Sequence, residues 1–331
     1  MNTLICMICG ILGNNSVQLP EMASGVDRHV KNESKIKQFK RFILGKYTDH
    51  ASLYLPFILP LLERLSAAGE LVFVIDGSSA GKECMLLMVS VVYKKRAIPI
   101  VWIATKGKKG HLPEALHCQL IAQLIAIVPV NCRKILLGDG EYDGNSLQAL
   151  LKEHGWDYVL RTRKDLLAKE DYSDDFCLKS LGTGRGQYFF LADILVTGQG
   201  YGPVNLLVWH NKKYKEALYL LTNLDYPPQI SGYYKKRFSI ETFFSDQKTK
   251  GFQLHRSRIE DPERLAQLLM AACLAYIFLL LIGLEAIKQQ LLPLIHRKRR
   301  CDWSLFTIGK RAFQYLIDKR IAYDLCYNLL L

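Results

Sequence analysis

Four side chains in the last third of the chain have types that could act together on a phosphate. Tyr234, Arg237, Glu241 and Lys248 follow the spacing Tyr-x2-Arg-x3-Glu-x6-Lys within YYKKRFSIETFFSDQK. At roughly 100° per residue, one α-helix would place all four within a sector of about 60°. The carboxylate could bind a hard divalent cation, while Arg and Lys bind phosphate oxygens. A solvated helix face with ion pairs one turn apart is the other interpretation.

Two aspartates could bring further carboxylates to the same place. Asp76 ends the apolar run LVFVID and Asp139 ends the run KILLGD, and both runs are predicted to be strands. Side chains at the carboxyl ends of adjacent strands converge at one edge of an α/β sheet. With Glu241 packed across that edge, three carboxylates could hold two Mg²⁺ ions roughly 3.5 to 4 Å apart, and Mn²⁺ could substitute. Each aspartate precedes a glycine, so a turn role is the alternative.

Two acidic residues follow the second aspartate closely. Glu141 and Asp143 are candidates for auxiliary ligands or for helix caps. Because Asp143 directly precedes the helical pattern GNSLQALLKEHG, it is predicted to cap that helix.

Composition limits the class of protein. The 331 residues are 50% hydrophobic, and 44 Lys and Arg against 31 Asp and Glu leave a net charge of +13. The apolar share excludes a disordered chain. The positive net charge favours a polyanionic partner, either nucleic acid or an anionic membrane. Nine cysteines form an odd set spread through apolar segments. They indicate reduced thiols in a cytosolic protein and no disulfide framework.

One apolar run could suggest a membrane protein. Residues 265 to 287 are numerous enough to span a bilayer and carry no charge before Glu285. As the only such run, preceded by a charged segment, it is predicted to be a helix buried in a soluble core. A membrane-surface protein that uses this run and the basic tail is the alternative. Residues 1 to 12 lack the features of a signal peptide.

The first 70 residues are predicted to be helical. In the segment SKIKQFKRFILGKY, Ile36, Phe39 and Ile43 share one side of a helix. Charge around the rest of that helix is expected from Lys35, Lys37, Lys40, Arg41 and Lys46. Such a basic helix could contact DNA or could be a plain solvated helix.

From residue 71 the pattern changes to strands. LVFVID, MLLMVSVVY and IPIVWIA are three β-rich runs, and a helix, the strand KILLGD, a second helix and the strand WDYVLR follow. Three consecutive strands before an alternation of helix and strand predict an α/β fold with a mixed sheet flanked by helices.

Residues 165 to 227 interrupt this alternation with glycine-punctuated, aromatic and β-branched sequence. They predict an antiparallel β-rich insertion with turns at GTGRG and GQGYG. Trp209 in this insertion could stack on a flipped base, although packing within the β structure is the favoured interpretation. Helices then resume, and they include a basic tract at 296 to 300 and a final helix at about 303 to 320.

These residues together resemble a DDE transposase of a bacterial insertion sequence, in the insertion-sequence-four family with its Y-R-E-K signature. All four signature positions match, Asp76 and Asp139 match the first two catalytic aspartates by their strand context, and YLLTNL closes the insertion. One departure follows Asp139, because many members carry an arginine there and this chain has Gly140 and Glu141.

The resemblance implies an RNase H-like catalytic core that a β-rich insertion interrupts. It implies that Asp76, Asp139 and Glu241 are catalytic and bind two Mg²⁺ ions, and that Tyr234, Arg237 and Lys248 hold DNA. The expected regions are a helical DNA-binding region (1–70), the first part of the core (71–164), the insertion (165–227), the second part of the core with the Y-R-E-K helix (228–290) and a basic helical tail (291–331).

The expected function is a transposase in which metal-activated water cleaves the ends of a transposon. The freed 3′-hydroxyl then attacks target DNA in line. Double-stranded DNA is the expected partner, a homodimer on DNA the expected assembly, and the bacterial cytoplasm at the nucleoid the expected location. A nuclease with an RNase H-like core but no strand transfer, and a DNA-binding derivative without catalysis, are the alternatives.

Overall fold

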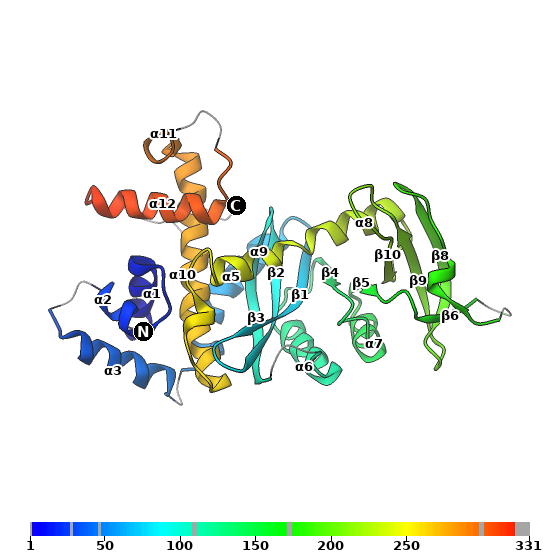
Figure 1. The fold of residues 1–331 in the computed structure, drawn as a ribbon, viewed down its shortest axis with the longest axis horizontal. Coiled ribbons are helices and arrows are strands. Elements are labelled where there is room, and N and C mark those ends of the chain that lie inside the picture. Colours follow the sequence, from blue (N-terminus) through cyan, green and yellow to red (C-terminus); the bar gives the residue numbers. More distant parts are fainter. Residues whose placement is uncertain are drawn as a thin grey trace.

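The computed structural model describes residues 2–26, 29–45, 48–107, 111–170, 174–297 and 301–321. Within them the strands form one ten-stranded mixed sheet in the order β3-β2-β1-β4-β5-β10-β9-β8-β6-β7 (Figure 1). The strands are β1 (Glu70–Ala80), β2 (Cys84–Tyr93), β3 (Arg96–Lys106), β4 (Arg133–Gly138), β5 (Asp157–Thr162), β6 (Leu167–Lys169), β7 (Phe176–Cys177), β8 (Tyr188–Val196), β9 (Tyr201–Trp209) and β10 (Leu218–Thr222).

The first five strands form the core of the fold. β1 pairs antiparallel with β2, and β2 pairs antiparallel with β3, while β4 lies parallel to β1 and β5 lies parallel to β4. The helices α6 (Glu114–Ile125) and α7 (Asn145–Glu153) make the two crossovers. This order confirms the predicted mixed sheet and its RNase H-like class. These strands could be predicted from the sequence because β1, β2 and β4 are buried on both faces and are therefore continuous apolar runs.

Two layers of helices enclose this core. Figure 1 shows α6 and α7 on one side of the strands and α8 (Pro227–Lys236) and α9 (Ser239–Gln247) on the other. α6 contacts β2 and β3, whereas α9 contacts β1 and β3 and α8 contacts β5. Each side of the core strands is therefore covered, which explains why their sequences are apolar at consecutive positions.

The predicted β-rich insertion is present and is continuous with the core sheet. β10 pairs antiparallel with both β5 and β9, so the two parts share one set of backbone hydrogen bonds. The insertion also has a small apolar cluster of its own, formed by residues that include Ile194, Leu206 and Val208. Trp209 is 3% exposed and stacks on Tyr188 with ring centroids 6.4 Å apart, so it packs within the fold.

The amino-terminal region is helical, as predicted. It contains α1 (Asn2–Asn14), α2 (Leu19–Ser24), α3 (Asn32–Ile43), α4 (His50–Leu53) and α5 (Leu55–Ser66). A Cβ atom on Gly10 would lie 2.3 Å from the carbonyl oxygen of Met22, so glycine permits the close packing of α1 against α2.

One charge predicted on the solvated side of α3 is buried. The Nζ of Lys35 donates to the carbonyl oxygens of Ala23 (3.2 Å) and Val26 (2.7 Å), and the residue is 6% exposed. The prediction was wrong for Lys35 because these carbonyls, at the end of α2, satisfy the ammonium group inside the protein. Lys46, which was grouped with it, lies outside the described residues.

The long apolar run forms α10 (Pro262–Lys288), which contacts α1, α3, β3 and α12 (Leu305–Asp318). It is long and apolar enough to cross a membrane, yet 83% of its most apolar 18-residue window is buried. The predicted burial of this run is therefore confirmed. Between α10 and α12 lie α11 (Leu292–Ile295) and the basic tract, of which residues 298–300 are outside the described part.

Candidate active site

The two aspartates lie opposite one another on neighbouring strands. In the parallel pairing of β1 with β4, Glu70 faces Arg133 and Val74 faces Leu137, a constant offset of 63 positions. Continuing this register places Asp76 opposite Asp139, and adjacent strands are about 4.8 Å apart. The predicted convergence of these two residues is what the backbone provides.

The prediction that Asp76 ends its strand was wrong. β1 continues to Ala80, and Asp76 pairs with Met88 in β2. The reason is that the antiparallel hairpin of β1 and β2 extends beyond the last residue pair of β1 and β4. Asp139 does directly follow the end of β4.

Alternation along β1 sets which helices face the aspartates. Asp76 and Ser78 share one face of the strand, and Gly77 belongs to the other. A Cβ on Gly77 would lie 3.3 Å from the hydroxyl of Tyr142, and the ring of Tyr142 lies 4.7 Å from that of His117 in α6. On the opposite face Lys248 donates through Nζ to Ser78 Oγ at 2.7 Å. The aspartates therefore face the side that α8 and α9 cover.

The four-residue signature does not lie on one uninterrupted helix. α8 ends at Lys236 and α9 begins at Ser239, and the amide of Ile240 donates to the carbonyl of Arg237 at 3.2 Å, a tighter i to i+3 pattern. Arg237 and Phe238 keep right-handed backbone angles, so the chain direction is preserved. Lys248 follows the end of α9 with φ −100° and ψ −112°. The prediction of a single helix was wrong, although Arg237 and Lys248 still reach the same face of β1.

Arg237 connects the two carboxylate-bearing elements. Its Nη2 donates to Glu241 Oε1 at 2.6 Å, and its Nη1 lies 3.8 Å from Asp76 Oδ2. The guanidinium also lies over the rings of Phe238 (4.7 Å) and Tyr234 (5.8 Å). The side chain is 8% exposed, and its buried Nε has no hydrogen-bond partner among the described residues. A guanidinium carries five N–H donors, so Arg237 could bind an anion that enters the site as well as its carboxylate partners.

Electrostatics make the aspartate pair a site of unmet negative charge. The pKa of Asp76 is raised to about 7, chiefly by burial and then by the charge of Asp139, against the opposing effects of Arg237 and the amide of Gly77. That amide donates to Asp76 Oδ1 at 2.8 Å. Two ionised carboxylates here repel each other unless a cation lies between them. Their hard oxygen atoms suit a divalent ion such as Mg²⁺.

A complete three-carboxylate ligand set is not assembled. Across the described ranges, no three His, Cys, Asp or Glu side chains lie close enough together to hold a metal ion. Asp76 and Asp139 supply two carboxylates, while Glu241, with a side chain that is 52% exposed, is bound to Arg237. The donor chemistry fits a divalent metal at the aspartate pair, and Glu241 would have to leave Arg237 to join it.

The structure adds one cation that the sequence reasoning missed. In the parallel pairing of β4 with β5, Gly138 faces Leu160, so the same register places Arg161 opposite Asp139. Arg161 is exposed, and its charge lowers the pKa of Tyr234, which burial raises. It also lines a cavity of about 550 Å³. The sequence held one signal for Arg161, which is the basic residue at the end of the predicted strand WDYVLR. The register therefore places a basic residue on the strand next to Asp139.

Tyr234 occupies a supporting position. It is 1% exposed and packs edge-on against Phe238 with ring centroids 6.5 Å apart. Lys248 is half-buried, and burial lowers its pKa. Tyr234 therefore lies beneath the guanidinium of Arg237.

The acidic residues after Asp139 have structural partners. Asp143 was predicted to cap α7, but its Oδ2 accepts from the hydroxyl of Thr162 at 2.5 Å. The amide of Leu147 in the first turn of α7 instead donates to Glu114 Oε1 at 3.0 Å. The prediction was wrong because a carboxylate from α6 already satisfies this helix end. Glu141 Oε1 accepts from the amide of Leu112 at 2.7 Å.

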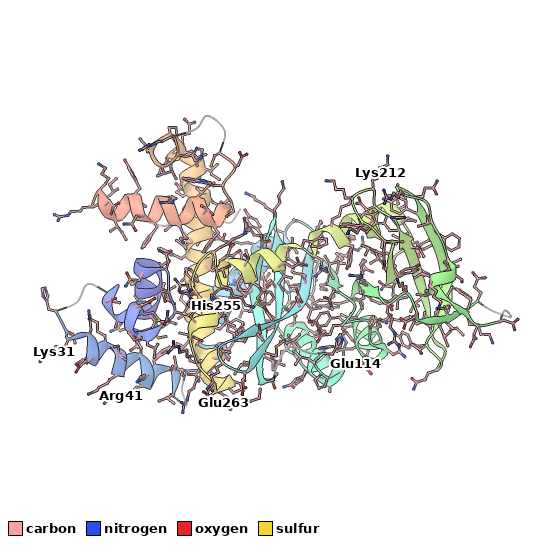
Figure 2. The ribbon with its side chains drawn as sticks, viewed as in Figure 1. Lys31, Arg41, Glu114, Lys212, His255 and Glu263 are labelled. Atoms are coloured by element: carbon pink, nitrogen blue, oxygen red, sulfur yellow. The ribbon has the colours of Figure 1, made fainter. Side chains whose placement is uncertain are left out.

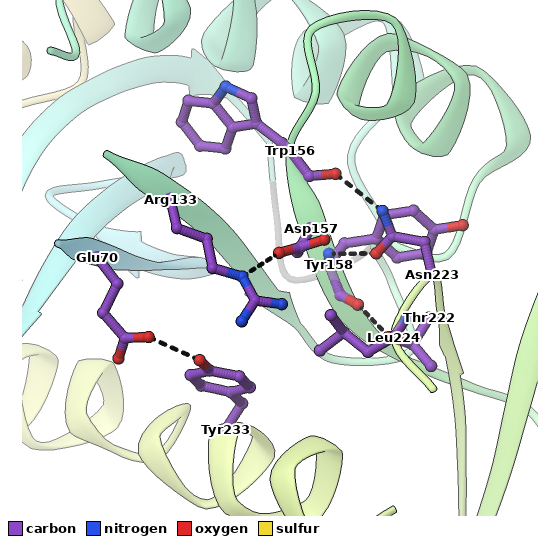
Figure 3. A network of polar contacts seen from close by, with 9 residues as sticks. All are labelled: Glu70, Arg133, Trp156, Asp157, Tyr158, Thr222, Asn223, Leu224 and Tyr233. Atoms are coloured by element: carbon purple, nitrogen blue, oxygen red, sulfur yellow. Dashed lines mark hydrogen bonds and ion pairs between the residues drawn. The ribbon is translucent and has the colours of Figure 1, made fainter. Parts of the chain in front are cut away.

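A polar network at the other end of these strands fixes α8 relative to the sheet (Figure 3). Tyr233 in α8 donates through its hydroxyl to Glu70 Oε2 at 2.7 Å. Asn223 accepts from the amide of Tyr158 and donates to the carbonyl of Trp156, both at 3.0 Å. These bonds tie β10 and α8 to β1 and β5, and so they position Tyr234, the next residue of α8, and Arg237, about one turn further along.

Comparison with known proteins was made on both sequence and structure. Residues 65–278 match the family model described as "Transposase DDE domain". No curated protein matches the sequence. Similar solved structures include a piggyBac transposase synaptic complex with hairpin DNA, at 14% identity and a TM-score of 0.48, covering 100% of this chain and 75% of that one. Human ENDOV has 16% identity and a TM-score of 0.27, covering 63% and 94%. The catalytic domain of human Endonuclease V has 14% identity and a TM-score of 0.28, covering 71% and 97%.

Proposed function

Because the chain belongs to the transposase DDE domain family, we propose that it cleaves the ends of a mobile DNA element and joins the freed 3′-hydroxyl to target DNA. The observation that carries this proposal is the aspartate pair in register on β1 and β4, facing Arg237 and Lys248. It places oxygen ligands for a divalent cation beside cations that can bind phosphate.

Asp76 and Asp139 would hold the divalent metal, and Glu241 would complete the ligand set. Two Mg²⁺ ions are the proposed complement, and Mn²⁺ would substitute because carboxylates suit both. When bound, the metal supplies an activated oxygen nucleophile and stabilises the leaving oxygen of the phosphodiester. A cation at the aspartates would balance the charge of Asp76 in place of Arg237, and Glu241 would have to leave Arg237 to join the ligand set.

Arg237 and Lys248 are the proposed phosphate-binding residues of this site, with Arg161 on the far side of Asp139. Arg237 lies 3.8 Å from Asp76, and Lys248 is held toward the sheet by Ser78. Tyr234 would act by supporting Arg237 and would reach DNA only after the covering residues move. From this pattern we propose that the chain belongs to the insertion-sequence-four family, of which Y-R-E-K is the signature.

Double-stranded DNA is the proposed partner, both as transposon ends and as target. The net charge of +13 favours it through the release of counterions from the phosphates. Since two ends must be cut for one element to move, a homodimer on DNA is the proposed assembly, in the bacterial cytoplasm at the nucleoid.

The decisive experiment uses duplexes that carry the inverted repeats flanking the coding region, incubated with the protein and Mg²⁺. Wild type is expected to yield cleaved ends and joined target products. Asp76→Ala, Asp139→Ala and Glu241→Ala are each expected to abolish both. Glu153→Ala, an exposed carboxylate on α7, is the matched control and should retain both activities.

Two outcomes would change the assignment. Cleaved ends without joined target products would indicate a nuclease that lacks strand transfer. Cleavage retained in any of the three carboxylate variants would remove that residue from the catalytic set.

A further inference from the structure

A basic cavity lies outside the site described above. It has a volume of about 590 Å³ and is formed by α3, the end of β3, the loop before α10 and the first turn of α10. Four exposed cations line it: Lys40, Lys106, Arg258 and Arg264. They come from segments far apart in the sequence, so the fold itself gathers this charge.

The acidic residues of the same cavity are already engaged. Glu260 forms an ion pair with Lys82, and Asp261 caps α10 by accepting from the amide of Arg264 at 2.9 Å. In contrast, no ion pair joins Lys40, Lys106, Arg258 or Arg264 to another residue within the described part of the chain. The four cations of the cavity therefore outnumber its two carboxylates, Glu260 and Asp261.

The cavity lies at the same edge of the sheet as the aspartates. Ala80 pairs with Cys84, and Cys84 pairs with Lys106, so the ends of β1 and β3 are aligned across β2. Lys106 is thus four residues along the strand and two strands across from Asp76. In a flat sheet this separation is roughly 16 Å.

Further cations occupy the interval. The charges of Arg256 and Lys248 add to the effect of burial in lowering the pKa of His255, so these three side chains lie near one another. In the view of Figure 2, His255 is labelled between α10 and the strands, Arg41 on α3 and Glu263 at the start of α10. Lys248, beside Ser78, and Arg256 therefore add positive charge near His255.

We propose that this cavity binds the phosphate backbone of the DNA duplex whose cleaved bond lies at Asp76 and Asp139. The inference rests on the proposed function, and it adds a second contact about five base pairs away, since one strand of B-DNA advances about 3.4 Å per phosphate. Such a contact fixes the position and angle of the duplex on the protein, which a single phosphate at the cleavage position cannot do.

The test is the salt dependence of binding to a duplex of transposon-end sequence, without divalent metal. Each neutralised phosphate contributes about 0.9 to the slope of log K against log salt. The triple variant Lys40→Gln, Lys106→Gln, Arg264→Gln is therefore expected to lower the slope by about 2.7. Between about 50 and 200 mM salt, wild type would lose about 40-fold more affinity than the variant.

The matched control neutralises three exposed lysines elsewhere, as Lys152→Gln, Lys213→Gln, Lys288→Gln. It has the same net charge as the cavity variant, and its slope is expected to stay close to that of wild type. Equal slopes for the two triple variants would overturn the inference. It would also be overturned if the cavity variant bound anionic vesicles more weakly than wild type while its DNA binding stayed unchanged. Wild type that binds no duplex DNA would overturn the proposed function itself, so the two failures are distinguishable.

Discussion

Replacing Asp76 by Asn should stabilise the metal-free protein at neutral and alkaline pH. The folded protein raises the pKa of this carboxyl from 3.8 to about 7, chiefly through burial and then through Asp139. Between about pH 4 and pH 7 the folded state therefore binds more protons than the unfolded state, and wild-type stability falls as the pH rises through that window. Above about pH 7 the full penalty is present.

The size of the effect follows from the shift. Each pKa unit corresponds to about 1.4 kcal/mol, so the ionised Asp76 lowers the free energy of unfolding by about 4 kcal/mol above pH 7. Asn carries no charge, and its Oδ1 can still accept the hydrogen bond from the amide of Gly77. The variant is expected to be more stable than wild type by up to about 4 kcal/mol near pH 8 and about equal to it near pH 4.

The assay is unfolding in a chelating buffer at a series of pH values for wild type, Asp76→Asn and the control Asp165→Asn. Asp165 has a side chain that is 67% exposed, and its ion pair with Arg163 contributes little. Saturating Mn²⁺ near pH 8 should stabilise wild type and leave Asp76→Asn unchanged. If the stability of Asp76→Asn followed the same pH profile as wild type, the reasoning would be refuted. The charged form of Asp76 would then not lower the free energy of unfolding.

Three further predictions test the frame around the site. Arg96→Ala should destabilise the protein by about 3 to 5 kcal/mol, because it leaves buried Asp246 without its partner at 3.0 Å; urea unfolding measures this, and a loss no larger than that of an exposed arginine would contradict it. Gly309→Ala should separate α12 from α10, since the new Cβ would lie 1.9 Å from the carbonyl oxygen of Leu279; increased hydrogen exchange across both helices is expected, and unchanged protection would argue against this packing. Arg161→Gln should lower the salt slope of DNA binding by about 0.9, one phosphate contact, in filter binding; an unchanged slope would remove Arg161 from the site.

Much of the core could be predicted because local patterns determine it. The apolar runs of β1, β2 and β4 and the alternation that follows them were enough to predict the mixed sheet and both crossover helices. Asp76 and Asp139 were identified because side chains at the carboxyl ends of adjacent strands converge. This predicted the correct edge of the sheet, but β1 continues beyond Asp76.

The parts that could not be predicted depend on pairing and packing between distant segments. The break between α8 and α9 at Arg237 leaves the backbone right-handed, so residue spacing alone does not report it. Buried Lys35 depends on the carbonyl groups of Ala23 and Val26, which the pattern of one helix cannot show. Arg161 joins the site only through the register of β4 with β5.

The central claim is that Asp76 and Asp139 together hold a divalent ion beside Arg237. Anomalous diffraction from crystals soaked in Mn²⁺ near pH 8 measures this directly. We predict an ion about 2.1 Å from carboxylate oxygens of both aspartates, with Arg237 displaced from Asp76. A Mn²⁺ ion bound elsewhere, or the aspartate pair still bridged to Arg237 with no ion between its carboxylates, would contradict the account.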